Sequence, residues 1–178
     1  MHAPTLFSIT SRLALGLVLA SATWARADAY DDVDRLIKAN SLEAALAKAE
    51  AYLSTKPADP QMRFLKGMVE RAQNKLEAAL QTFTNLTEEY PELAEPHNNL
   101  AVLYAARGQY QQAQKALEMA IKAKPDYAAA HENLADVHVR LAQQAYQHVG
   151  RLEPQNARAA QKLKMAEQLL KPQQGSSR

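Results

Sequence analysis

Histidine and carboxylate side chains are the residues of this sequence that could support metal or acid–base chemistry. His131 and Glu132 begin a pattern like the zinc-binding motif His-Glu-x-x-His, but Ala135 stands where the second histidine belongs. His138 follows His131 by seven residues, which is two helical turns and too far for both rings to bind one ion. Glu132 and Asp136 are spaced i, i+4 on one helix face, without a pocket-forming loop around them. We therefore interpret the histidines as packing residues and the acid pair as a solvated face.

Other catalytic signatures are also missing from the sequence. The chain has no cysteine, no serine in a nucleophile-elbow glycine pattern and no glycine-rich phosphate loop. The sequence therefore predicts a protein that is not an enzyme and needs no cofactor and no metal. An accessory role in a metal-dependent enzyme is the catalytic alternative, and it would require metal in the purified protein.

The N-terminal segment, residues 1–27, has the layout of a secretory signal peptide. Residues 1–12 carry one arginine and no acid, residues 13–20 are apolar, and Ala25-Arg26-Ala27 is a small-x-small cleavage site before the first acid, Asp28. The alternative is an uncleaved membrane anchor, but the apolar run is too short to span a bilayer comfortably. We expect cleavage after Ala27 and a soluble, exported product, with the bacterial periplasm as its compartment.

Charge is balanced overall but uneven along the chain. Removal of residues 1–27 leaves 19 bases and 19 acids, so the mature chain is formally neutral. Residues 28–100 hold 13 acids and 8 bases, whereas residues 101–178 hold 6 acids and 11 bases. A nucleic-acid binder would need a basic face with interleaved aromatic residues, so we expect no nucleic-acid partner. The asymmetry could orient a partner or a second copy, or it could be a solvated surface.

A sequence repeat organises the middle of the chain, and its proline recurs at equal intervals at Pro57, Pro91 and Pro125. The repeat is clearest in residues 94–127, where small, large and turn-forming residues fall at repeat positions 7, 8, 11, 15, 20, 24, 27 and 32. These residues are Leu100, Ala101, Tyr104, Gly108, Ala113, Leu117, Ala120 and Pro125. The pattern resembles the tetratricopeptide repeat, a helix–turn–helix unit of about 34 residues.

The resemblance implies an all-α fold: a short right-handed superhelix of about three helical hairpins, a long fused helix and a C-terminal capping helix. Asn40 and Asn74 occupy the turn position of the first two repeats, where they can adopt the left-handed backbone that glycine favours. The expected organisation is an array over residues 28–154, a capping helix over 155–171 and a disordered tail over 172–178. Within the array, the expected repeats are 28–59, 60–93, 94–127 and a degenerate 128–154.

The degenerate repeat has lost its turn. Pro154 follows Pro125 at a shorter interval than Pro125 follows Pro91, and no Gly, Pro or Asn lies between Leu134 and Val149. The sequence therefore predicts one continuous helix over residues 127–150, with a tight hairpin as the alternative. Asn156 is expected to cap the last helix. The long helix carries a stripe with 4-3-4-3 spacing: Tyr127, His131, Leu134, His138, Leu141, Ala145, His148 and Leu152.

Proteins of the resembled family bind polypeptides in a concave groove, to which positions 2, 5, 9, 12 and 13 of each repeat contribute. Here those positions imply an apolar floor flanked by side chains that can hydrogen-bond a peptide or helix. The implied groove residues are Phe64, Met68, Arg71, Asn98, Val102, Ala105, Glu132, Asp136 and Arg140. In the alternative interpretation, Phe64 and Met68 only pack between repeats.

The function implied is that of a protein–protein interaction module, here a periplasmic adaptor or assembly factor that binds a peptide or helix of an envelope protein. Family members that grip acidic chaperone tails use a lysine at position 5 and an asparagine at position 9, which this sequence lacks. The second hypothesis is a structural homodimer formed through the long helix, because a helix that cannot fold back can dock on another copy.

Overall fold

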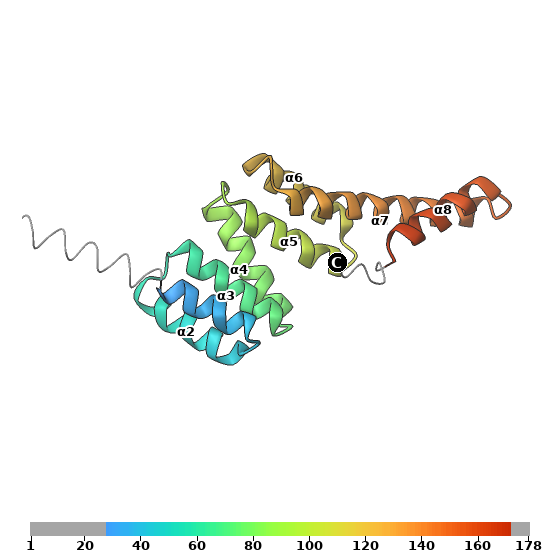
Figure 1. The fold of residues 1–178 in the computed structure, drawn as a ribbon. Coiled ribbons are helices and arrows are strands. Elements are labelled where there is room, and N and C mark those ends of the chain that lie inside the picture. Colours follow the sequence, from blue (N-terminus) through green and yellow to red (C-terminus); the bar gives the residue numbers. More distant parts are fainter. Residues whose placement is uncertain (1–27, 172–178) are drawn as a thin grey trace, which may run out of the picture. The chain divides into compact units, whose positions relative to one another are not determined.

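The computed structural model describes residues 28–171, and every regular element in that range is a helix (Figure 1). The expected signal peptide and C-terminal tail lie outside the described residues. The all-α prediction is confirmed, and none of the described helices has the length and apolarity needed to span a membrane. A helix over residues 28–38 precedes α2 (Leu42–Thr55), α3 (Pro60–Ala72), α4 (Leu76–Glu89), α5 (Ala94–Ala106), α6 (Tyr110–Ala123), α7 (Ala128–Leu152) and α8 (Ala157–Leu169).

The chain reverses direction after three of its helices, each time at a residue with a left-handed backbone. Asn40, Asn74 and Gly108 have φ values of 55°, 59° and 71°, and they fall at the same position of successive repeats. This conformation is the one that closes a helix C-terminus, and asparagine and glycine tolerate it best. The predicted turn role of both asparagines is confirmed. The next backbone N–H closes each turn on the carbonyl five residues earlier: Ser41 to Leu36, Lys75 to Glu70 and Gln109 to Tyr104, at 2.9, 2.8 and 2.9 Å.

The chain divides into two compact units, of which the first ends at Ala79. Its core consists of Val33, Ala45, Ala49, Met62, Leu65 and Val69. The buried carboxylate of Asp59 ties three helices together in this unit. Its Oδ1 accepts the Met62 backbone N–H at 3.0 Å and so caps α3, while its Oδ2 accepts the hydroxyls of Tyr30 at 2.7 Å and Tyr52 at 3.2 Å.

The second unit begins at Leu80 and contains α5 to α8. Its core is rich in alanine, so the helix backbones of α5, α6 and α7 can lie close together. The residues of this core are Ala101, Ala113, Ala116, Leu117, Ala120, Ala130 and Val137.

The continuous helix predicted from the missing turn is confirmed. Helix α7 runs without interruption for 25 residues, and only its first half packs against α6 (Figure 1). The chain then turns, and α8 packs antiparallel on the second half of α7. Asn156 caps α8 as expected, because its Oδ1 accepts the Ala159 backbone N–H at 2.9 Å.

Equivalent alanines on α5 and α7 allow a matched stability test. Ala101 and Ala135 both occupy repeat position 8, but Ala101 is 1% exposed in the α5–α6 seam whereas Ala135 is exposed, since no helix folds back on it. We expect Ala101→Trp to lower the free energy of unfolding by about 3 kcal/mol, because a large ring would force α5 and α6 apart. Ala135→Trp should change it by less than about 0.5 kcal/mol. Urea unfolding followed by circular dichroism measures both, and equal losses would contradict this account of the seam.

Candidate functional site

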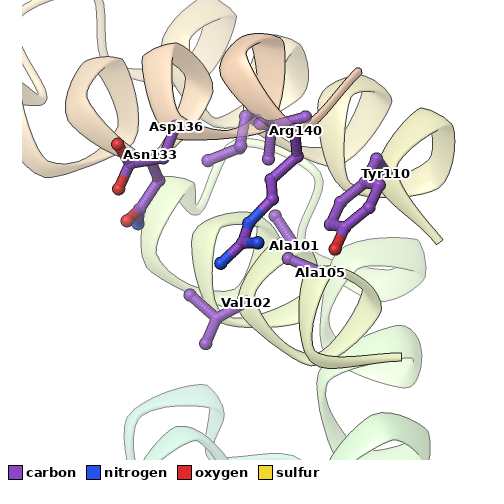
Figure 2. Close-up of a pocket in the computed structure, with 9 residues that line it drawn as sticks. Ala101, Val102, Ala105, Tyr110, Asn133, Asp136 and Arg140 are labelled. Carbon is purple, nitrogen blue, oxygen red and sulfur yellow. The ribbon is translucent and has the colours of Figure 1, made fainter. Parts of the chain in front are cut away.

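The second unit contains a hollow of about 290 Å³ bounded by α5, α6 and α7 (Figure 2). Alanine and valine side chains of α5 form its apolar floor, and polar side chains of α7 form one wall. The lining residues are Ala101, Val102, Ala105, Tyr110, Leu117, Asn133, Asp136, Val137 and Arg140.

A partly buried hydrogen bond sets the register of α7 against α5. The Nδ2 of Asn133 donates to the Oδ1 of Asn98 at 2.8 Å, and Asn98 is only 8% exposed. Breaking one partner of such a bond leaves a buried polar group unsatisfied, so the pair strongly favours one alignment of the two helices. This alignment places Asp136 and Arg140, one and two turns beyond Asn133, along the edge of the hollow.

Arg140 and Asp136 are the charged groups of the hollow. Figure 2 shows the Arg140 side chain extending from α7 into the hollow, with its guanidinium above Val102. Within the described range, neither Arg140 nor Asp136 takes part in an ion pair. Both side chains are therefore available to a polar group that enters the hollow, above a floor that would receive an apolar side chain.

Four of the nine groove residues expected from the sequence line this hollow: Val102, Ala105, Asp136 and Arg140. Asn98 of α5 does not line the hollow, and its side chain accepts the bond from Asn133. Glu132 is exposed and does not line the hollow.

The other three expected residues belong to the first unit. Phe64, Met68 and Arg71 lie on α3, and each is half-buried. Their assignment to a binding groove remains a prediction.

Sequence reasoning did not assign Tyr110 and Asn133 to the site. Tyr110 begins α6, and because α6 runs antiparallel to α5, its first turn lies beside the last turn of α5. That connection geometry was a usable signal for Tyr110. Asn133 bonds Asn98, and its side chain also lines the hollow.

Two histidines at repeat position 4 form hydrogen bonds with the loops that precede their helices. The Nε2–H of His97 donates to the Pro91 carbonyl at 3.1 Å, and that of His131 donates to the Pro125 carbonyl at 2.9 Å. Burial lowers the pKa of His97, against the opposing effect of its bond to Pro91. The packing interpretation holds for His97, which is 6% exposed, whereas His131 is exposed. Across residues 28–171, the His, Asp and Glu side chains form no group of three or more that could hold one metal ion.

Comparison with known proteins identifies the repeat. Residues 61–126 match a family model described as tetratricopeptide repeat. No curated protein matches the chain.

Solved structures of low sequence identity share the fold. TTC0263, a thermophilic TPR protein from Thermus thermophilus, is 19% identical with a TM-score of 0.61, over 80% of this chain and 81% of its own. YrrB, described as a TPR protein with an unusual peptide-binding site, is 16% identical with a TM-score of 0.55, over 79% and 75%. A structure of Naa15/Naa10 bound to HypK-THB is 21% identical with a TM-score of 0.58, over 80% of this chain but only 22% of that longer chain.

Proposed function

Because the chain is a tetratricopeptide repeat protein, we propose that it binds a segment of another polypeptide in the hollow between α5, α6 and α7. The repeat family generally provides non-enzymatic interaction scaffolds, and YrrB is described as having a peptide-binding site. The observation that carries the proposal is the combination of an apolar floor with the unpaired charges of Asp136 and Arg140 at its edge.

The open form of the hollow supports a peptide segment rather than a cofactor as the occupant. Its volume of about 290 Å³ is close to that of the smallest pockets for drug-sized ligands, about 300 Å³, but those pockets enclose most of the ligand, whereas this hollow is open on one side. An apolar side chain would lie on Val102 and Ala105. The Arg140 guanidinium, with several N–H donors in a rigid fork, would bind a backbone carbonyl or a carboxylate of the same segment.

The setting we propose is the bacterial periplasm, where the chain would serve as an adaptor or assembly factor for an envelope protein. The support is the signal-peptide pattern of residues 1–27, with its apolar run followed by small residues at Ala25 and Ala27. The mature chain would then begin at Asp28, the first residue of the first described helix.

The hollow can be tested with selected peptides. Peptides chosen from a random displayed library on the mature chain should bind Arg140→Ala at least about tenfold more weakly, because a charged hydrogen bond of roughly 1.5–3 kcal/mol is lost. Fluorescence anisotropy with one labelled peptide measures the dissociation constant. Lys122→Ala is the matched control, since it removes an exposed base of α6 outside the hollow. Equal affinities of the wild-type chain and the Arg140→Ala variant, or an equal loss in both variants, would contradict the proposal.

Export is tested by expressing the full chain in a Gram-negative host. We expect the periplasmic fraction to hold a product whose mass and N-terminal sequence correspond to a start at Asp28, because signal peptidase requires small residues at the positions of Ala25 and Ala27. Ala27→Leu should leave the longer precursor. Recovery of the intact precursor alone from the wild-type gene would reject the assignment.

A further inference from the structure

The second half of α7 and helix α8 form a two-helix arm, defined here as residues 139–170 (Figure 1). Large apolar side chains are unusually exposed on it: Leu152 is 69% exposed, Met165 57% and Leu169 71%. Single exposed apolar residues need no explanation, but several on one surface point to an interaction site. Their arrangement therefore decides whether they form a site.

The contact between the two helices of the arm follows matched seams. We place the seam of α8 at Ala159, Leu163, Ala166 and the C-cap residue Leu170, because both alanines are buried and both leucines are half-buried. We place the seam of α7 at the half-buried Ala142, Tyr146 and Val149, and the Lys162 ammonium of α8 lies 5.4 Å from the centre of the Tyr146 ring.

On both helices, the exposed apolar residues belong to the row that lies one sequence position before the seam residues. Two antiparallel helices are related by a local two-fold axis perpendicular to their plane, so residues with the same offset from the seam lie on the same side of the pair. The two rows therefore form one face, which we call the arm face. It consists of Leu141, Ala145, His148 and Leu152 of α7 and Arg158, Lys162, Met165 and Leu169 of α8.

The arm face continues a surface that is already packed inside the second unit. Leu134 and Leu141 lie on the α7 row that packs against the core beneath α6. Beyond Leu141 none of the described helices covers this row, and Ala145, His148 and Leu152 are exposed. A third helix lying on the arm face, in line with α6, would therefore cover it as α6 covers the first half of α7.

The charge of the arm indicates which kind of helix would bind the arm face. The arm, residues 139–170, holds five bases and two acids, a net charge of +3. The arm face itself carries Arg158 and Lys162 and no acid. A second copy would bring only further basic side chains to this face, whereas a helix with acidic flanks would complement Arg158 and Lys162.

We propose that the arm face binds an amphipathic helix of a partner protein, whose apolar stripe lies between α7 and α8 and whose acidic flank faces Arg158 and Lys162. The site is separate from the hollow between α5, α6 and α7. The chain thus offers two surfaces, so it can hold two segments of one partner or two partners at once.

Two designed peptides of opposite charge test the proposal. Each is a stapled helix of about 20 residues that repeats the Ala-x-x-x-Leu-x-x-Ala spacing of α6, with glutamate at the flanking positions of one peptide and lysine at those of the other. The mature chain should bind the acidic peptide at least about tenfold more tightly than the basic one, measured by fluorescence anisotropy in low salt. The preference should shrink as salt is added. Equal binding of both peptides, or no binding of the acidic one, would overturn the proposal.

Substitutions on the arm test whether the acidic peptide binds the arm face. Leu152→Ser combined with Leu169→Ser should weaken the acidic peptide at least about tenfold, and the exposure of both residues leaves the helices folded, as circular dichroism would verify. The matched control replaces exposed residues outside the arm face, Gln147→Ser with Gln161→Ser, and should bind as the unchanged chain does. Arg140→Ala, which alters the hollow, should also leave binding unchanged. Loss of binding in the controls, or none in the double leucine variant, would refute the assignment.

Other occupants give different results. If a second copy covers the arm face, light scattering will show a dimer that the Leu152→Ser and Leu169→Ser variant dissolves. If a membrane does so, vesicles of anionic phosphatidylglycerol will sediment the unchanged chain but not the variant. Either result overturns the proposal, whereas a monomer that stays off the vesicles and binds the acidic peptide supports it.

Discussion

Reversal of the chain in the three hairpins of residues 28–123 depends on one residue whose backbone enters the left-handed region. Asn40, Asn74 and Gly108 supply it, and the hydrogen bond of the following N–H closes the end of each helix. A residue with a bulky or branched side chain would add strain there, so the turn is encoded by very few residue types. Where the sequence offers none of them, the helix has no low-energy place to stop, and α7 continues for 25 residues.

Both candidate surfaces follow from that uninterrupted helix. The first half of α7 packs on the alanine-rich seam of α5 and α6, where Asn98 and Asn133 fix its register and the hollow forms. The second half extends past the first residue of α6, so α8 is the only one of the described helices that packs against it. A turn in the middle of α7 would have removed the arm and covered Ala135 as α6 covers Ala101.

Local rules were sufficient to predict the helices from the sequence, because the turn asparagines, the prolines after helix ends and the Asn156 cap act within a few residues. The site was harder, since repeat position alone does not say which side chain is already engaged. Asn98 and Val102 both occupy expected groove positions, yet Asn98 is held by Asn133 while Val102 lines the hollow. Tyr110 was missed because the predicted groove positions all lie on the first helix of a repeat, whereas Tyr110 begins the second helix of its hairpin.

The most direct test is a measurement of the distance along α7, between a site near its start and a site near its end. The chain contains no cysteine, so Glu132→Cys and Arg151→Cys, both at exposed sites, would carry the only two spin labels. Pulsed electron resonance should give a single narrow distribution centred at about 28 Å, the separation of these two positions at about 1.5 Å per residue in a straight helix. A distribution centred well below 28 Å would mean that the chain folds back within α7, because the axes of two packed helices lie about 8–10 Å apart, and it would contradict the account.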